Sequence, residues 1–206
     1  MEQQWTESQK FEKSWWLTYE SRHAYEIIKG DFIGRIMMLD KGFPERTVID
    51  IGSGPFSLLQ RIPVKRGTAV DPIYYDGLEE GYKAKNIERI IMRGEDLDTL
   101  DDRFNEAWIY NCLQHVINPT RILKNAMILA PIVRIFEWIN IPPYEGHLHM
   151  LTPALLEAPF IEQGWTILQK STGFLNHDDL GGEYFSAIYQ KTQLGPPHTS
   201  LDVFIT

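Results

Sequence analysis

A glycine-containing turn follows the first buried run of the sequence and has the form of a ligand-binding loop. The run TVIDI (residues 47–51) leads into Gly52-Ser53-Gly54, and a helix expected from Pro55 would offer unpaired backbone N–H groups to a ligand. Such turns also bind dinucleotides, but the third glycine of G-x-G-x-x-G is replaced by Ser57. Asp50, two residues before the turn, would repel a pyrophosphate and favour a ligand that carries an ammonium and a sulfonium group.

Acidic side chains and a backbone turn follow the next three predicted strands. Asp71 ends the second strand, where a carboxylate can accept hydrogen bonds from both hydroxyls of a ribose, each worth about 1.5–3 kcal/mol. An aspartate after a strand is in general more often a helix cap, but the glycine turn at this spacing favours the ribose. Glu95 and Asp96 follow the third strand, where the amino group of an adenine would be met. After the fourth strand, a turn beside the same pocket is expected at Asn111, Cys112 and Leu113.

The stretch NIPPYEGHLHM (residues 140–150) supplies two candidate catalytic bases. His147 and His149 are two residues apart, so in an extended loop they share one side, and His115 after the fourth strand is a third candidate. Histidine, with an unperturbed pKa near 6.5, suits the removal of a proton from an acceptor oxygen or nitrogen. Loop histidines are often only structural, and His115 could simply cap or pack against the next helix. A zinc site with Cys112 is disfavoured because no spacing supplies a fourth ligand.

Two further stretches have a simpler interpretation beside a functional one. NHDDL (residues 176–180) is similar to a magnesium site, but a solvated turn in a hairpin is favoured. Trp15, Trp16 and Tyr19 have helical spacing and are expected to pack mainly in a helix core, with one ring free to face a substrate.

The elements that would position these residues alternate between strand and helix. Helix is expected over residues 8–39 with a break near Gly30, and again after Pro55. Asn118 and Thr152, each followed by proline, predict two more helix starts. Strands are expected at 47–51, 67–71, 88–92, 105–111 and 131–139, followed by a hairpin of 166–172 and 184–192. This alternation predicts an α/β fold with a mostly parallel sheet of about seven strands, helices on both faces, and ligands at the carboxyl ends of the strands.

The composition indicates one globular domain. The chain has 206 residues, a hydrophobic content of 43% and a net charge of −8, which disfavours a nucleic-acid partner because phosphate binding depends on clustered Lys and Arg. A single cysteine, the lack of a signal peptide and the lack of a membrane span suit a cytoplasmic protein. We expect a core over 47–191, a helical N-terminal segment over 1–40 and a loosely held tail over 192–206.

Taken together, VIDIGSGP, VDP, GEDL and WIYNCLQHVINPTRILKNA resemble the class I S-adenosylmethionine-dependent methyltransferases, in particular the small type 11-like group, over residues 47–191. The resemblance implies a three-layer Rossmann-like fold of seven strands, the last antiparallel, and S-adenosylmethionine as cofactor. It places Asp50 and Gly52 near the methionine, Asp71 and the adjoining Pro72 near the ribose, and Glu95 or Asp96 near the adenine. Leu113 would line the cofactor from the far side, and N-terminal helices of this kind form a lid over the acceptor.

These features predict methyl transfer to a small molecule, at oxygen rather than carbon. NIPPY is not the Asn-Pro-Pro-Tyr box of DNA base methyltransferases, because it follows the fifth strand instead of the fourth and Ile141 lengthens it. An NAD-dependent oxidoreductase and a non-catalytic binding or scaffold protein remain as alternatives.

Overall fold

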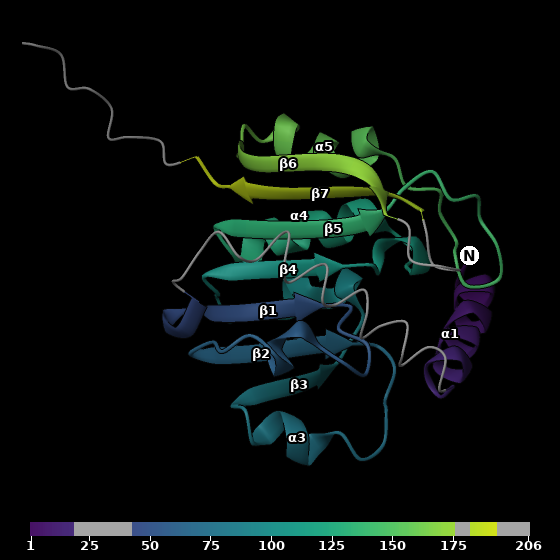
Figure 1. Ribbon diagram of the computed structural model, residues 1–206, viewed down its shortest axis with the longest axis vertical. Helices are drawn as coiled ribbons and strands as arrows, with labels where there is room; N and C mark the ends of the chain where they lie inside the picture. The colour runs from purple at the N-terminus through teal and green to yellow at the C-terminus, as the bar shows by residue number, and fades with distance from the viewer. Residues whose placement is uncertain (19–42, 176–181, 193–206) are drawn as a thin grey trace, which may run out of the picture.

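The computed structural model describes residues 1–18, 43–175 and 182–192, and its centre is a seven-stranded sheet (Figure 1). Each predicted strand is present within three residues of its expected bounds. They are β1 Thr47–Ile51, β2 Arg66–Asp71, β3 Ile87–Ile91, β4 Glu106–Tyr110, β5 Ile132–Trp138, β6 Thr166–Leu175 and β7 Gly182–Gln190.

The strand order is β3-β2-β1-β4-β5-β7-β6. Strands β1 to β5 are parallel, whereas β7 is antiparallel to both of its neighbours. The predicted mostly parallel sheet with an antiparallel C-terminal strand is therefore confirmed. The order reverses between β1 and β4, and ligands of open α/β sheets bind at the carboxyl ends of the strands beside such a reversal.

The helices of the described residues include four α-helices, α1 Glu2–Trp16, α3 Glu79–Lys83, α4 Pro119–Leu129 and α5 Pro153–Glu162. The 3-10 helices are η2 Phe43–Glu45, η3 Leu58–Gln60, η4 Gly94–Thr99 and η5 Leu113–His115. The two predicted caps are present, because the side chain of Asn118 accepts a hydrogen bond from the Arg121 N–H and that of Thr152 from the Leu155 N–H.

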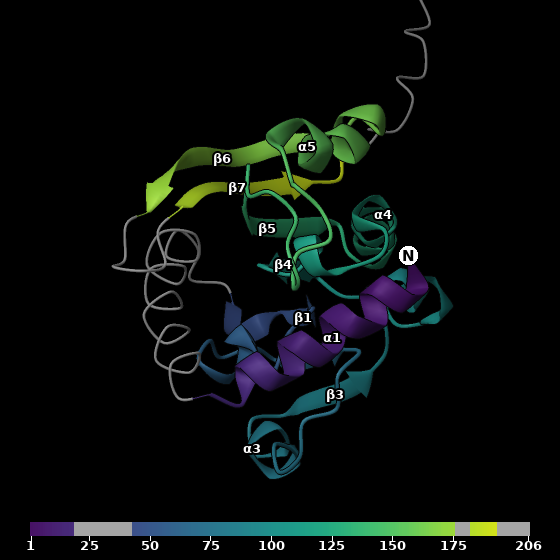
Figure 2. The same ribbon diagram turned by 90° about the vertical axis from the view of Figure 1, so that its right-hand side faces the viewer.

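Two apolar clusters pack on opposite faces of the sheet. On one face, α4 and α5 bury residues such as Ile122, Leu123 and Phe160 against the strands (Figure 2). On the other, residues from η2, η3 and α3 pack against Trp108 and Phe136. The structure thus has three layers, and the sheet is buried on both sides as parallel sheets are.

Two expected helices differ from the structure. The helix predicted from Pro55 is reduced to η3, because Ser57 is extended with φ −49° and ψ 141° and caps η3, while Pro63 disfavours helical backbone at Ile62. The N-terminal helix begins at residue 2, not at 8. The rest of that prediction, including Tyr19, lies outside the described residues, as do NHDDL and most of the predicted tail. No helix in the described ranges has the length and apolarity to cross a membrane.

Candidate functional site

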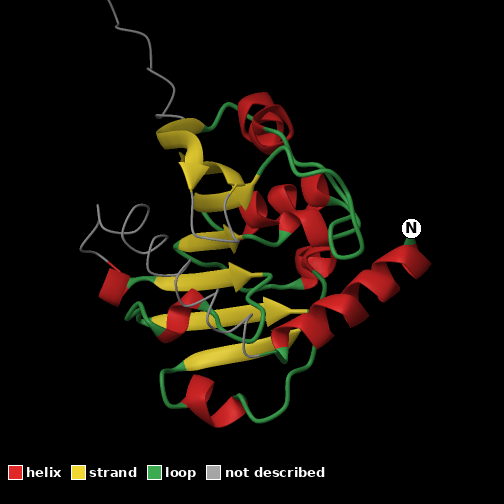
Figure 3. Ribbon diagram, turned by 45° about the vertical axis from the view of Figure 1, so that its right-hand side comes forward, coloured by secondary structure: helices red, strands yellow, loops and turns green. Residues whose placement is uncertain are grey.

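A cavity of about 470 Å³ lies where the parallel strands end, against α1. The arrowheads of these strands point towards α1, which runs across the carboxyl edge of the sheet (Figures 2 and 3). The wall is formed by residues at or after the ends of β1 to β4, by the end of β5 and the loop that follows it, and by α1. Its volume is in the range of small-molecule sites.

The glycine turn after β1 forms one wall of this cavity. Gly52 and Gly54 have φ of +73° and +55°, which glycine adopts without strain. The N–H groups of Gly52 and Ser53 both donate to the Val70 carbonyl, at 2.8 and 3.0 Å. A Cβ on Gly52 would lie 2.4 Å from the Cβ of Cys112, so the turn has room for glycine only.

Asp50 lies beneath the turn and is not part of the cavity wall. Its side chain accepts a hydrogen bond from the Ser57 hydroxyl, and the residue is only 3% exposed. Its position was predicted to be near the methionine of the cofactor. In the structure Asp50 instead links β1 to Ser57, the residue that replaces the third glycine.

Asp71 and Pro72, which were predicted to lie near a ribose, line the cavity. The two carboxylate oxygens of Asp71 accept hydrogen bonds from the Gly54 N–H at 2.8 Å and the Ile73 N–H at 2.9 Å. Burial raises the pKa of Asp71 to about 6. Each carboxylate oxygen can accept a second hydrogen bond, so two adjacent hydroxyl groups fit this carboxylate.

Of the two acids after β3, only Glu95 lines the cavity. One of its oxygens accepts hydrogen bonds from the N–H groups of Ile117 at 2.9 Å and Asn118 at 3.0 Å. Asp96 is exposed and is not part of the wall. Glu95 therefore ties the end of β3 to the start of α4, and Gly94 beside it faces Ile122 so closely that a Cβ would lie 2.7 Å from that side chain.

The turn after β4 is held by a buried glutamate from β5. Asn111, with φ +52°, and Cys112 line the cavity, whereas Leu113 is fully buried behind them. One oxygen of Glu137 accepts the N–H groups of Cys112 and Leu113, each at 3.1 Å. Burial raises the pKa of Glu137 to about 8, and its other oxygen has no hydrogen-bond partner among the described residues.

Two of the three predicted histidines meet at the cavity. The rings of His115 and His147 lie edge to face with centroids 4.6 Å apart. Nδ1 of His115 lies 2.7 Å from the Gly146 carbonyl oxygen, which can only accept, so Nδ1 carries the hydrogen. Nε2 then accepts from the Gln114 side chain at 3.0 Å. Burial lowers the pKa of His115 to about 4 and that of His147 to about 3, so both are neutral at pH 7.

The third histidine, His149, is not part of the cavity wall. The prediction that it shares one side with His147 assumed an extended loop. Residues 144 to 147 instead form a tight turn, in which Tyr144 and His147 exchange two backbone hydrogen bonds of 3.0 Å. His149 consequently lies against η5, with Nε2 at 2.8 Å from the Val116 carbonyl oxygen.

Glu12 of α1 is a cavity residue that the sequence analysis missed. Its carboxylate lies 3.2 Å from Nδ1 of His115, accepts a hydrogen bond from the indole of Trp16, and has a side chain 14% exposed. Burial raises the pKa of Glu12 to about 7. The available signal was the helical spacing of Ser8, Glu12 and Trp16, which places polar groups on the same face as an aromatic one.

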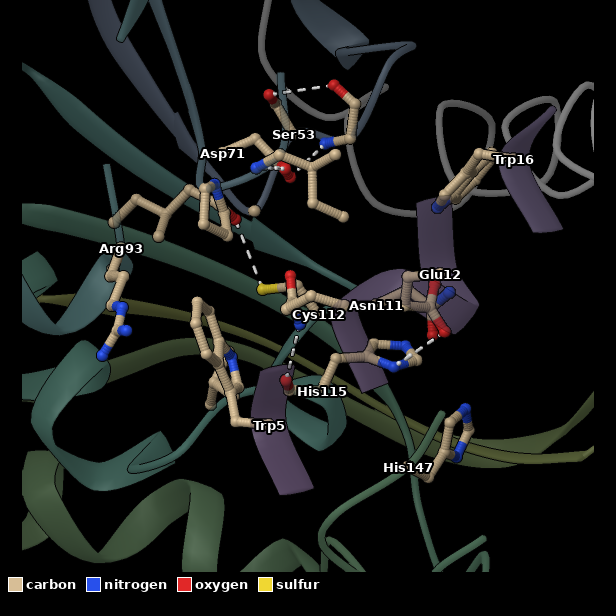
Figure 4. Close-up of a pocket in the computed structure, with 18 of the residues that line it drawn as sticks. Trp5, Glu12, Trp16, Ser53, Asp71, Arg93, Asn111, Cys112, His115 and His147 are labelled. Atoms are coloured by element: carbon tan, nitrogen blue, oxygen red, sulfur yellow. Dashed lines mark hydrogen bonds and ion pairs between the residues drawn. The ribbon is translucent and has the colours of Figure 1, made fainter. Parts of the chain in front are cut away.

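Helix α1 is attached to the strand ends at several points. At its start, Glu2 forms a two-point ion pair with Arg93 at 2.9 and 3.1 Å, and the Arg93 guanidinium lies 4.0 Å from the Trp5 ring centroid. In its middle, the hydroxyl of Ser8 donates to the Gly146 carbonyl at 2.9 Å. Figure 4 shows Arg93 and Trp5 on one side of the cavity, and Glu12, His115 and Trp16 on the other.

The wall carries more negative than positive groups. Three carboxyl side chains, Glu12, Asp71 and Glu95, line the cavity together with a single arginine, Arg93, which is itself paired with Glu2. Burial opposes ionisation of Asp71 and Glu12, so a cation would bind favourably beside them and a diphosphate would not.

The strand order, the glycine turn after β1 and the acid after β2 together define the class I S-adenosylmethionine-dependent methyltransferase fold, and solved structures of that fold match the chain. No protein-family model matches the sequence, and no curated protein does.

Three solved structures illustrate the similarity. The Burkholderia thailandensis 1,6-didemethyltoxoflavin-N1-methyltransferase, with bound 1,6-didemethyltoxoflavin and S-adenosylhomocysteine, has 18% identity and a TM-score of 0.59 over 83% of this chain and 90% of that one. The magnesium protoporphyrin IX methyltransferase of Synechocystis, with bound S-adenosylmethionine, has 14% identity and a TM-score of 0.57 over 82% and 79%. The [4+2]-cyclase SpnF has 14% identity and a TM-score of 0.59 over 82% of each chain. The shared fold therefore does not by itself determine the reaction.

Proposed function

We propose that the protein transfers a methyl group from S-adenosylmethionine to an oxygen of a small-molecule acceptor. The observation that carries this proposal is the cavity at the β1/β4 reversal, where the glycine turn and the Asp71 carboxylate face one space. Gly52 to Gly54 would lie against the methionine part, Asp71 would accept the ribose hydroxyls, and Glu95 with Val116 and Ile122 would flank the adenine.

The chemistry of the wall supports this donor over a dinucleotide. S-adenosylmethionine carries an ammonium and a sulfonium, which suit three carboxyl groups, whereas the diphosphate of NAD would be repelled by them. The two solved structures with bound S-adenosylmethionine or S-adenosylhomocysteine described above have the same fold. A small acceptor is supported by the cavity volume of about 470 Å³ and by the net charge of −8, which does not favour a polyanion.

Calorimetric titration with S-adenosylmethionine tests the donor. We expect micromolar binding, corresponding to about −8 kcal/mol, and Asp71→Ala should weaken it by one to two orders of magnitude. A wild-type protein that does not bind the donor would refute the proposal.

Titration with NADH is the matched test of the oxidoreductase alternative, and we expect no quenching of protein fluorescence. To test for turnover, the protein is incubated with labelled donor and a fractionated metabolite extract, and methylated products are sought by mass spectrometry. A protein that binds the donor but methylates no acceptor would instead be a binding or scaffold protein.

A further inference from the structure

The part of the cavity beyond the strand reversal has a different character from the glycine-turn side. We call it the acceptor side and define it by six residues, Phe11, Glu12, Tyr110, Trp138, Tyr144 and His147. Four of the six are Phe, Tyr or Trp, and Glu12 is the only carboxylate among them. Such a wall offers flat apolar surfaces and one point of strong polarity.

Three of the four ring nitrogens of His115 and His147 are engaged by the chain itself, whereas Nδ1 of His147 is buried without a hydrogen-bond partner among the described residues. His115 uses Nδ1 towards the Gly146 carbonyl and Nε2 towards Gln114, so it has no free lone pair for a substrate proton. Nε2 of His147 lies 2.9 Å from the Tyr144 hydroxyl. The Glu12 carboxylate faces the cavity from α1 and lies 3.2 Å from Nδ1 of His115, whose hydrogen is directed to the Gly146 carbonyl.

From this geometry we propose that Glu12 is the catalytic base, and that the acceptor is a planar aromatic ring bearing a hydroxyl group. This inference rests on the proposed function. It assigns the aromatic side chains as the surfaces against which the acceptor ring packs, and the indole of Trp16 as the hydrogen-bond donor that orients the Glu12 carboxylate.

The transfer step balances with one proton acceptor. S-adenosylmethionine supplies the methyl group: the acceptor oxygen forms the new C–O bond with its electron pair, the C–S bond breaks, and its electrons remain on sulfur in neutral S-adenosylhomocysteine. Glu12 takes the hydroxyl proton as the C–O bond forms and then releases it to solvent. An ammonium acceptor fits less well, because an ionised Glu12 beside it would stabilise the protonated form, which has no lone pair to attack.

The protonation behaviour of Glu12 agrees with this role. Burial raises its pKa to about 7, near the pH at which a general base is most effective. The titratable groups around it include His115 from η5, His147 and Tyr144 from the loop after β5, and two residues of the segment that begins at the end of β2, Asp71 and Tyr75, whose pKa values are raised in part by Glu12. Both histidines are neutral at that pH, so a rate change near pH 7 that Glu12→Gln abolishes would report Glu12, whereas one that persists would report Asp71 or Glu137.

A substitution at Gly146 can test the role of Glu12 without changing Glu12 itself. A Cβ at this glycine would lie 2.7 Å from Oε1 of Glu12 and 3.0 Å from the Phe11 ring. The carboxylate is the free end of a flexible side chain, so Gly146→Ala should displace it without removing it.

Acceptor recognition is tested by titrating the protein with probe compounds in the presence of S-adenosylhomocysteine, with tryptophan fluorescence as the measure of binding. The probes are 2-naphthol, its saturated analogue decahydro-2-naphthol, and 2-methoxynaphthalene, in which the hydroxyl is blocked. We expect 2-naphthol to bind at least tenfold more tightly than the saturated alcohol and to yield the methyl ether with donor, and the blocked ether to bind without reacting. Equal affinity of the first two compounds, failure of 2-naphthol to bind, or preferred methylation of the amine 1,2,3,4-tetrahydroisoquinoline would each overturn the acceptor class.

The base is tested by Glu12→Gln, with Glu7→Gln as control because Glu7 is exposed on the same helix. We expect Glu12→Gln to lower kcat by about 10²–10⁴-fold at saturating donor and to abolish the rise of kcat/KM with pH near pH 7. Gly146→Ala should lower kcat while keeping the pH dependence. Unchanged turnover or an unchanged pH profile in Glu12→Gln would refute the role of Glu12. Failure of the wild-type protein to bind the donor would instead refute the proposed function.

Discussion

Glu137 gives the protein a specific dependence of stability on pH. The carboxyl is fully buried at the end of β5 and holds the turn after β4 through the N–H groups of Cys112 and Leu113. Its pKa rises from 4.5 in a solvated chain to about 8 in the fold. Because the folded pKa is the higher one, the stabilisation is complete below pH 4.5 and is lost as the pH rises to about 8. At about 1.4 kcal/mol per pH unit, the loss amounts to at most ~5 kcal/mol.

Glu137→Gln removes this titration and keeps a neutral side chain of the same shape. The amide oxygen can accept from the same two N–H groups, and the amide nitrogen takes the place of the oxygen that lacks a partner among the described residues. We therefore expect the variant to match the wild type near pH 5 and to be more stable by several kcal/mol near pH 9.

Urea unfolding across this pH range, analysed by linear extrapolation, measures the difference. Other groups with raised pKa values contribute equally to both proteins and cancel. Glu80→Gln, an exposed position in α3, serves as control and should give a difference that stays flat with pH. A difference between Glu137→Gln and the wild type that is equally flat would refute the reasoning.

Three further outcomes follow from the site. Gly52→Ala should abolish detectable donor binding in calorimetry, because its Cβ would lie 2.4 Å from that of Cys112 at a φ of +73°; retained micromolar affinity would contradict this. His149→Ala should leave kcat within twofold and cost about 1 kcal/mol in urea unfolding, since it loses only the hydrogen bond to Val116; a large loss of kcat would return His149 to the active site. Glu2→Gln should weaken the attachment of α1 to Arg93 and speed amide hydrogen exchange in the first turns of α1, and unchanged exchange rates would show that the ion pair is dispensable.

The sequence was sufficient for the sheet because each strand carries its own local signals. Apolar runs bounded by glycine, proline and capping residues identified all seven strands, and Asn118 and Thr152 identified two helix starts. The helix expected after β1 was wrong because the extended Ser57 and the following Pro63 leave room for a single 3-10 turn.

The site was harder to predict because its acceptor side is made by contacts between distant parts of the chain. Glu12 and His115 are more than one hundred residues apart in the sequence, and no local sequence pattern predicts that their side chains lie close together. The tight turn at 144–147 separates His147 from His149, although their spacing suggested a shared side. Asp50 was predicted to lie near the methionine of the cofactor, and the sequence did not indicate that its buried carboxylate accepts a hydrogen bond from the Ser57 hydroxyl.

The residues proposed to bind the donor and those proposed to bind the acceptor come from different parts of the chain. The groups proposed to hold the donor come from the ends of β1, β2 and β3 and from the region around the start of α4, and a single added carbon at Gly52 or Gly94 has no space there. The acid and much of the aromatic surface come from α1 and the loop after β5, segments that pack on the edge of the sheet and are not woven into it. Under the proposed function, exchanging those two segments would change the acceptor while the residues that bind the donor stay in place, so acceptor selectivity can change in evolution, or be altered in the laboratory, without a new donor site.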